Sequence, residues 1–351
     1  MTQDTISSLS AKLALSYASH QLSVAPMMDW TDRHCRYFHR LLAPKAALYT
    51  EMVTANAIRF GNVERLLAGH HNAPNYQPDQ AIILQLGGAD PDALADAIRI
   101  AEPYGYAEYN LNVGCPSDRV QSGQFGAALM ADPVLVGELV AAMQSATKRP
   151  VSVKCRLGID DMDIHDALDH FIDTIIGGGV DHIIVHARQA WLKGLSPKEN
   201  RDIPPLNYDR VYALKQRLLA AANDLPISIN GGFTDWHDIR LGLDQVDGVM
   251  LGRAAYQQPA QLAIWAAQVF GHDAADANMV MSAMAAYADH EVAKGERLIA
   301  ITRHMLGFAS GRKGARSWRR TLSEEARGQA SDGNLIREAW KALELEHEEA
   351  A

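Results

Sequence analysis

Eight short apolar segments recur along the chain, and stretches with helical periodicity lie between several of them. The apolar segments cover residues 22–29, 47–52, 81–86, 106–112, 151–155, 182–186, 226–230 and 248–252. Helical periodicity is clearest in residues 91–102, 133–147, 164–176 and 208–222. Strands that are apolar on both faces and alternate with helices are typical of a parallel sheet that helices cover on both sides.

Eight such units in about 250 residues predict an α/β fold of the (β/α)8 TIM-barrel type. A doubly wound sheet is the alternative, but it needs a glycine-rich turn after the first strand, where Pro26, Met27 and Met28 stand. From about residue 273 only helical patterns remain, at 279–294, 297–309, 315–327 and 334–345. We therefore expect a loose leader (1–20), a catalytic barrel (21–272) and a small C-terminal helical bundle (273–351).

Composition narrows the class of protein further. The 48% hydrophobic content excludes a disordered chain. The three cysteines form no CxxC pair, which excludes a disulfide framework and predicts no bound metal. No segment approaches the roughly 18 apolar residues of a membrane span, and residues 1–20 do not resemble a signal peptide. We expect a cytoplasmic, monomeric protein that does not bind membranes.

The formal net charge is −9, but the basic residues are unevenly distributed. Residues 297–320 hold seven basic side chains and no acidic one: Arg297, Arg303, Arg312, Lys313, Arg316, Arg319 and Arg320. Most charge runs are only solvated surface. A local block of this size nevertheless attracts a polyanion such as a nucleic acid.

Five polar or reactive residues stand at the carboxyl ends of consecutive predicted strands: Gln85, Cys115, Lys154, His186 and Asn230. One such residue is usually structural, and Cys115 alone would most simply be a small buried apolar residue. Five that converge on one barrel mouth favour an active site instead. Burying the Lys154 ammonium without a partner is costly, so we expect negative charge beside it.

Two glycine-containing segments predict a source for the negative charge expected beside Lys154. Asn230-Gly231-Gly232 follows the seventh strand and Gly252-Arg253 follows the eighth, where barrels commonly hold a phosphate group. Together with an inward lysine, an inward histidine and a thiol, they fit flavin mononucleotide (FMN). Lys154 would stabilise the reduced ring and Gln85 would hydrogen-bond its edge. The long, proline-broken segment 191–205 should lie on the same face and cover or extend the site.

Several of these motifs closely resemble the tRNA-dihydrouridine synthase family. The shared stretches include 25–32, Asn110-Leu111-Asn112-Val113-Gly114-Cys115-Pro116-Ser117, 153–158, 185–188, 230–232 and 252–253. The chain is most similar to the A class of this family, which also has the stretches 194–201, 301–307 and 314–320. The resemblance spans residues 22 to about 325.

The resemblance implies a reaction and a set of site residues. In that family NADPH reduces FMN, FMN passes hydride to C6 of a uridine, and a cysteine protonates C5; the A class acts on uridines 20 and 20a in the D-loop of tRNA. By resemblance Cys115 is the acid and Asn112 meets the target base. The residues that would hold FMN are Pro26, Met27, Met28, Gln85, Lys154, His186, Asn230, Gly231, Gly232, Gly252 and Arg253. Those that would orient the tRNA are Lys198, Arg201, Arg316 and Arg319.

Other interpretations of the same residues stay open at this stage. Cys155 alternates with Lys154 along one strand, so it should face away from the barrel interior, and Cys35 has no feature that favours it. Trp318 lies near the arginines of its helix but is expected in the core. A dihydroorotate-dehydrogenase-like FMN oxidoreductase is the nearest rival enzyme, although it has no need of a basic helical tail. A non-catalytic RNA-binding barrel is the rival from another class, and it would bind no flavin.

Overall fold

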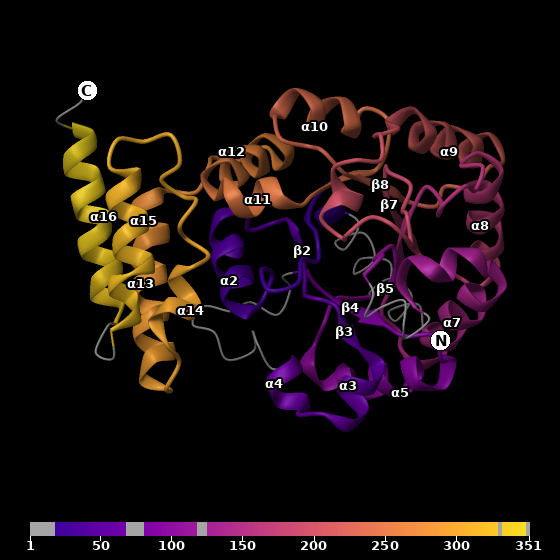
Figure 1. Ribbon diagram of the computed structural model, residues 1–351, viewed down its shortest axis with the longest axis horizontal. Helices are drawn as coiled ribbons and strands as arrows, with labels where there is room; N and C mark the ends of the chain where they lie inside the picture. Colours follow the sequence, from indigo (N-terminus) through magenta and orange to yellow (C-terminus); the bar gives the residue numbers. More distant parts are fainter. Residues whose placement is uncertain (1–17, 68–80, 118–124, 329–331, 349–351) are drawn as a thin grey trace, which may run out of the picture. The chain divides into compact units, whose positions relative to one another are not determined.

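The computed structural model describes residues 18–67, 81–117, 125–328 and 332–348 (Figure 1). Its centre is a closed barrel of parallel strands, and all eight predicted strands are confirmed. They are β1 (Leu22–Val24), β2 (Ala47–Tyr49), β4 (Ile82–Gly87), β5 (Glu108–Val113), β6 (Val151–Arg156), β7 (His182–His186), β8 (Ile227–Asn230) and β9 (Gly248–Leu251). Their order is β2-β1-β9-β8-β7-β6-β5-β4, and pairing of β2 with β4 closes the ring.

One strand was not predicted. The two-residue strand β3 (Val53–Thr54) pairs with Leu86 and Gly87 at the carboxyl end of β4. A strand of two residues is too short to show any periodicity in a sequence. It extends β4 at the barrel mouth and lies outside the closed ring.

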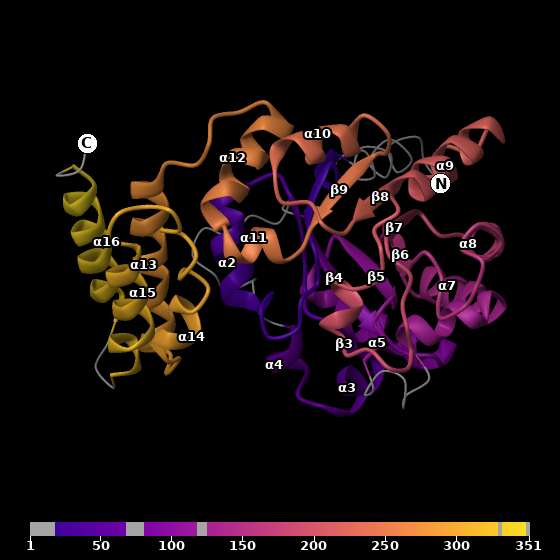
Figure 2. The ribbon, with the colours of Figure 1, turned by 45° about the horizontal axis from the view of Figure 1, so that its top comes forward.

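Helices surround the barrel strands (Figure 2). They are α3 (Ala55–Phe60), α4 (Val63–Leu67), α5 (Pro91–Ala101), α7 (Pro133–Ala146), α8 (Asp166–Gly177), α9 (Tyr208–Ala220) and α10 (Trp236–Leu243). The four predicted helices correspond to α5, α7, α8 and α9 within two residues at each end. Asp90 and Asp132 cap the first turns of α5 and α7, and a proline follows each of them, which is why both starts were visible in the sequence.

Distances between residues divide the chain into two compact units. The first comprises residues 1–27, 47–68 and 78–252 and contains the barrel, and the second comprises 28–46, 69–77 and 253–351. The second unit holds α2 (Arg33–Leu42), α11 (Arg253–Gln257), α12 (Pro259–Phe270), α13 (Ala277–Ala293), α14 (Leu298–Thr302), α15 (Ala315–Ser323) and α16 (Gly333–Glu348). Helices α13, α15 and α16 pack side by side (Figure 1). Of the expected leader, residues 1–17 lie outside the described residues.

The core of the second unit is aromatic and aliphatic. Trp318 is 1% exposed, and its indole Nε1 donates a hydrogen bond to the Met305 carbonyl at 3.0 Å. Its ring meets the Trp340 ring edge to face. The expectation that Trp318 is a core residue is therefore confirmed.

Two predicted helices are shorter than expected. The helix expected over 315–327 ends as α15 at Ser323, and a 3-10 turn at Glu325–Arg327 follows it. Residues 297–309 were expected to form a single helix, but α14 ends at Thr302 and turns with i to i+3 hydrogen bonds follow. Within these turns Gly307 approaches the backbone of α11 closely, since a Cβ added there would lie 2.3 Å from the Gln257 carbonyl oxygen. This close backbone approach fixes the path of the segment against α11, and local helix propensity does not overcome it.

The prediction that the strands are apolar on both faces is wrong for the side that faces the barrel interior. Alternate residues share a face, and the inward positions of four strands are mostly polar: Glu108, Asn110 and Asn112 on β5, Ser152, Lys154 and Arg156 on β6, His182 and His186 on β7, and Ser228 and Asn230 on β8. The apolar interior cluster consists of Ala25, Ala47, Tyr49, Ala81, Ile83, Ile184 and Met250. Polar groups are tolerated at this depth because they hydrogen-bond to one another.

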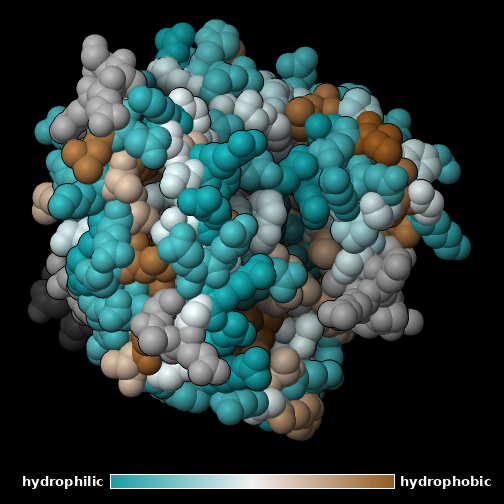
Figure 3. Space-filling model, turned by 60° about the vertical axis from the view of Figure 1, so that its left-hand side comes forward, coloured by the Kyte–Doolittle hydropathy of each residue, from teal (hydrophilic) through white to brown (hydrophobic). Residues whose placement is uncertain are grey.

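The surface seen in Figure 3 is mostly hydrophilic, with small apolar areas between the polar side chains. Within the described residues, no helix is both long and apolar enough to cross a membrane.

Candidate active site

The turn after β5 holds the thiol of Cys115. The side-chain oxygen of Asn112 accepts hydrogen bonds from the backbone N–H groups of Gly114 (3.1 Å) and Cys115 (3.0 Å). Asparagine favours this arrangement, in which its side chain replaces a backbone acceptor within a turn. The Arg156 guanidinium donates to the Gly114 carbonyl at 3.1 Å, and the Ala127 N–H donates to the Cys115 carbonyl at 2.9 Å. The half-buried Cys115 side chain is therefore carried on a backbone fixed from three sides.

The structure brings the predicted polar strand-end residues together. The Asn112 amide donates to Gln85 Oε1 at 2.9 Å, and Lys154 Nζ donates to Asn230 Oδ1 at 2.9 Å. Register places Asn112 beside Lys154, and His186 beside Asn230. These hydrogen bonds and register pairs thus link five residues in turn across β4 to β8: Gln85, Asn112, Lys154, Asn230 and His186. Cys115 interacts electrostatically with both Lys154 and Arg156, so its thiol lies near these two cations of β6.

Lys154 has no carboxylate partner among the described residues. Burial lowers its pKa to about 7, and the nearby Arg156 cation acts in the same direction. No described carboxylate of the chain supplies the negative charge that we expected beside Lys154. An anionic ligand would supply that charge.

His186 is a buried neutral imidazole at the same edge. Burial, assisted by four surrounding cations, holds its pKa well below the usual range. Its Nδ1 atom has no hydrogen-bond partner in the described part of the chain. A buried polar atom without a partner costs free energy, and a ligand group at this position would remove the cost.

The turn after β8 requires glycine at two successive positions. Gly231 and Gly232 have φ angles of 119° and 77°. A Cβ on Gly232 would lie 2.6 Å from the Leu206 side chain, and the Tyr208 hydroxyl donates to the Gly231 carbonyl at 2.6 Å. The backbone is therefore free to approach a ligand only on the side away from Leu206 and Tyr208. Gly252, after β9, has open space around an added Cβ.

The remaining residues predicted to hold FMN are divided between the two compact units. Pro26 and Met27 follow β1 in the first unit, while Met28 and Arg253 belong to the second. Met28 is 57% exposed and Arg253 begins α11. In the second unit, the Asp32 carboxylate accepts hydrogen bonds from Arg303 (2.6 Å) and His304 (3.1 Å). These bonds join two of the stretches on which the family resemblance depends.

The segment 191–205 folds around a buried asparagine. Asn200 Oδ1 accepts from the Trp191 N–H at 2.7 Å, and its amide donates back to the Trp191 carbonyl at 2.9 Å. Arg156, at the end of β6, donates to the Asn200 carbonyl at 2.9 Å. The segment therefore lies at the carboxyl ends of the strands, as expected, and it exposes Lys198 and Arg201.

The second pair of predicted tRNA-binding residues lies on α15. Arg316 and Arg319 are exposed and three residues apart, so they share one face of the helix. Neither forms an ion pair with a described carboxylate. Their positive charge is therefore available to an external anion.

Sequence reasoning missed a group of buried polar residues below the mouth: Glu108, Asn110, Ser152, His182 and Ser228, with His20 just before β1. The signal was present as polar residues at every second position of β5 to β8. Ligand-type atoms of His20, Glu108 and His182 lie within 4.8 Å of one another. The Nδ1 atoms of both imidazoles lack partners among the described residues, whereas a ligating histidine usually donates from its second nitrogen. We therefore describe this group as two sets of hydrogen-bonded side chains: His20, Glu108, Ser152 and Asn110 in one, and His182 and Ser228 in the other.

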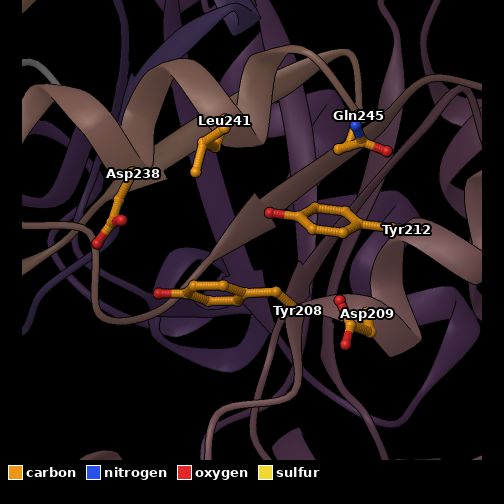
Figure 4. Close-up of a pocket in the computed structure, with 6 residues that line it drawn as sticks. All are labelled: Tyr208, Asp209, Tyr212, Asp238, Leu241 and Gln245. Carbon is orange, nitrogen blue, oxygen red and sulfur yellow. The ribbon is translucent and has the colours of Figure 1, made fainter.

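A pocket of about 380 Å³ lies outside the barrel, between α9 and α10 (Figure 4). Its lining consists of Tyr208, Asp209, Tyr212, Asp238, Leu241 and Gln245, and the two tyrosine rings extend from α9 toward the side chains of α10. None of the predicted site residues lines it. Tyr208 connects it to the predicted site residues through its hydrogen bond to the Gly231 carbonyl.

Comparison with known proteins gives a consistent result. A family model described as Dihydrouridine synthase (Dus) matches residues 23–344. A protein of Escherichia coli (strain K12) named tRNA-dihydrouridine(20/20a) synthase is 50% identical over 328 residues, which is 93% of this chain and 92% of the relative. Proteins with the same name from Salmonella typhimurium and Xanthomonas campestris pv. campestris are each 49% identical, over 328 and 321 residues. These matches cover 93% and 92% of this chain, and 96% and 93% of the relatives.

Proposed function

The chain belongs to the dihydrouridine synthase family, and from that premise we propose that it reduces uridines 20 and 20a in the D-loop of tRNA to 5,6-dihydrouridine. The observation that carries the proposal is the Cys115 turn. Its thiol is half-buried, its backbone is fixed by Asn112, and it lies beside a lysine that no described carboxylate neutralises.

FMN is the cofactor we propose, with NADPH as the reductant. The residues assigned to hold it are Pro26, Met27, Met28, Gln85, Lys154, His186, Asn230, Gly231, Gly232, Gly252 and Arg253. Three features fit such a ligand: the lysine without a carboxylate partner, the unpartnered Nδ1 of His186 and the glycine turn after β8. The bound flavin would supply the hydride that reduces C6 of the uracil ring.

The protein's own residues then have separate tasks. Cys115 donates the proton from its sulfur to C5. A general acid acts from its protonated form and needs no base to activate it, so the step requires only proximity and correct orientation. Asn112 uses one amide hydrogen for Gln85 and has a second one left for a carbonyl oxygen of the base. The Lys154 ammonium, when protonated, stabilises negative charge in the site.

The tRNA must present its base outside the stack, since the thiol lies at a barrel mouth. We assign the phosphate contacts that orient the tRNA to Lys198 and Arg201 in the first unit and to Arg316 and Arg319 in the second. Residues 273–351 would then act as the tRNA-binding domain and residues 21–272 as the catalytic barrel. The reaction belongs in the cytoplasm, where NADPH and tRNA are present.

The purified protein provides the test. It should be yellow, release FMN on denaturation and form dihydrouridine at positions 20 and 20a when incubated with unmodified tRNA and NADPH. Dihydroorotate should not reduce its flavin. Absence of flavin, or flavin reduction by dihydroorotate without any dihydrouridine in tRNA, would overturn the proposal.

A further inference from the structure

A single chain of hydrogen bonds connects the Cys115 turn with the floor of the barrel. Asn112 Nδ2 donates to Gln85 Oε1 (2.9 Å), and Gln85 Nε2 donates to Asn110 Oδ1 (2.8 Å). Asn110 Nδ2 donates to Ser152 Oγ (2.8 Å), and the Ser152 hydroxyl donates to the Glu108 carboxylate. Every side chain in this series is buried, and those of Asn110, Ser152 and Glu108 are 0% exposed.

The two ends of the chain fix its direction. At the mouth, Asn112 meets two backbone N–H groups, which can only donate, so its oxygen must face them. At the floor, the Glu108 carboxylate accepts from the Ser152 hydroxyl. Each amide between these ends has therefore one orientation that pairs every donor with an acceptor. Rotating any one of them by 180° would bring donor against donor and acceptor against acceptor.

Glu108 is itself held in place. Its second oxygen accepts from His20 Nε2 at 2.7 Å, so both carboxylate oxygens have a donor. Ser228 is a useful contrast. It is equally buried and also lies near the amino end of its strand, but its hydroxyl pairs with His182 and not with the chain that leads to the mouth.

We propose that Ser152 and Glu108 are positioning residues that hold, from the barrel floor, the amide orientation of Gln85, which Asn112 contacts from the mouth. The proposal rests on the proposed function, in which Gln85 contacts the flavin and Asn112 the base. Removing the Ser152 hydroxyl leaves Asn110 Nδ2 without its acceptor. If Asn110 then rotates, Gln85 loses its own acceptor, and the disturbance reaches the ligand-binding side chains although the mutated residue touches no ligand.

The test compares Ser152→Ala with Ser228→Ala. Flavin is removed from each variant and from the wild type, and FMN is titrated back while its fluorescence and visible spectrum are recorded. We expect Ser152→Ala to bind FMN at least about tenfold more weakly, with an altered visible spectrum, and Ser228→Ala to bind within about twofold of wild type. Equal affinities and spectra for the two variants would overturn the proposal. Failure of the wild type to bind FMN would instead refute the proposed function.

Glu108 provides a second comparison. In Glu108→Gln the new side chain still accepts from Ser152 through its oxygen, while its amide nitrogen donates to His20 in the other tautomer. Glu108→Leu offers neither group. We expect the glutamine variant to keep FMN affinity within about threefold and the leucine variant to lose at least tenfold; identical losses would contradict an orienting role. If Ser152→Ala does not fold, the first comparison is repeated with Ser152→Cys and Ser228→Cys. In these variants a thiol, which is a weak donor and a weak acceptor, replaces the hydroxyl.

Discussion

Asn112 joins two parts of the candidate site through the two ends of one amide group. Its oxygen holds the turn that carries Cys115, and its nitrogen holds Gln85. The position of the proposed acid and the orientation of the amide assigned to the flavin therefore depend on the same side chain. The contact with Gln85 could not be predicted from the sequence, which places Asn112 and Gln85 27 residues apart.

Replacing Cys115 with alanine should separate cofactor binding from chemistry. The change removes the proposed proton donor and leaves the Asn112 turn, which uses backbone N–H groups, in place. We expect FMN to stay bound and dihydrouridine formation to fall by at least about 100-fold, the usual contribution of a general acid. Cys155→Ala is the control, because burial raises the pKa of that thiol to about 12 and it takes no part in the proposed reaction. Full activity of Cys115→Ala would remove it from the mechanism.

Lys154 should make flavin binding depend on pH. With a pKa of about 7 in the flavin-free protein, it loses its proton as the pH rises through neutrality. A negatively charged ligand favours the protonated form, so FMN affinity should fall above pH 7 by up to about tenfold per pH unit. FMN titrations of the flavin-free protein between pH 7 and 8.5 measure this. Lys154→Met should bind weakly at every pH, and an equally steep dependence in that variant would exclude Lys154 as the cause.

At the scale of elements, the strands were predictable because their outward residues are apolar and their ends carry glycine, proline or asparagine. The inward polar residues of β5 and β6 were not interpreted, because a polar residue at every second position also describes a strand exposed to solvent. Pairing of β5 with β6 brings Asn110 to Ser152, and closure of the barrel shows that the pattern lines an interior. The close approach of Gly307 to Gln257 was equally hidden, since it joins positions 50 residues apart.

Helix α15 should contribute to tRNA affinity through its charge. Arg316 and Arg319 are exposed on one face, while Trp318 anchors the helix in the core. We expect Arg316→Ala and Arg319→Ala each to weaken tRNA binding and to reduce the slope of log K against log salt by about 1. Lys341→Ala, which removes an exposed charge from α16, is the control. Binding curves at four salt concentrations that match the wild type would refute a phosphate contact on α15.

At the scale of the whole molecule, both compact units bury neutral histidines. In the second unit, burial lowers the pKa of His34 to about 4 and that of His39 to about 3. In the barrel, burial holds the pKa of His182 well below its usual range. The unfolded chain takes up protons on these residues below pH 6.5, whereas the folded protein does not. Stability must therefore decrease as the pH falls from about 6.5 toward 4.

This predicts a protein whose stability is sensitive to mild acid. Between pH 7 and 5 each such histidine should cost about 2 kcal/mol of the free energy of unfolding. Urea unfolding at pH 7, 6 and 5 measures this loss of free energy of unfolding. In His39→Gln the loss between pH 7 and pH 5 should be smaller by about 2 kcal/mol, the contribution of one histidine, even if the variant is less stable at pH 7. His237→Gln, on the exposed surface of α10, should leave the pH dependence unchanged. If the free energy of unfolding depended on pH in the same way for wild type and His39→Gln, His39 would be protonated equally in the folded and unfolded states. That result would contradict the prediction, because burial in α2 disfavours the charged imidazole in the folded protein.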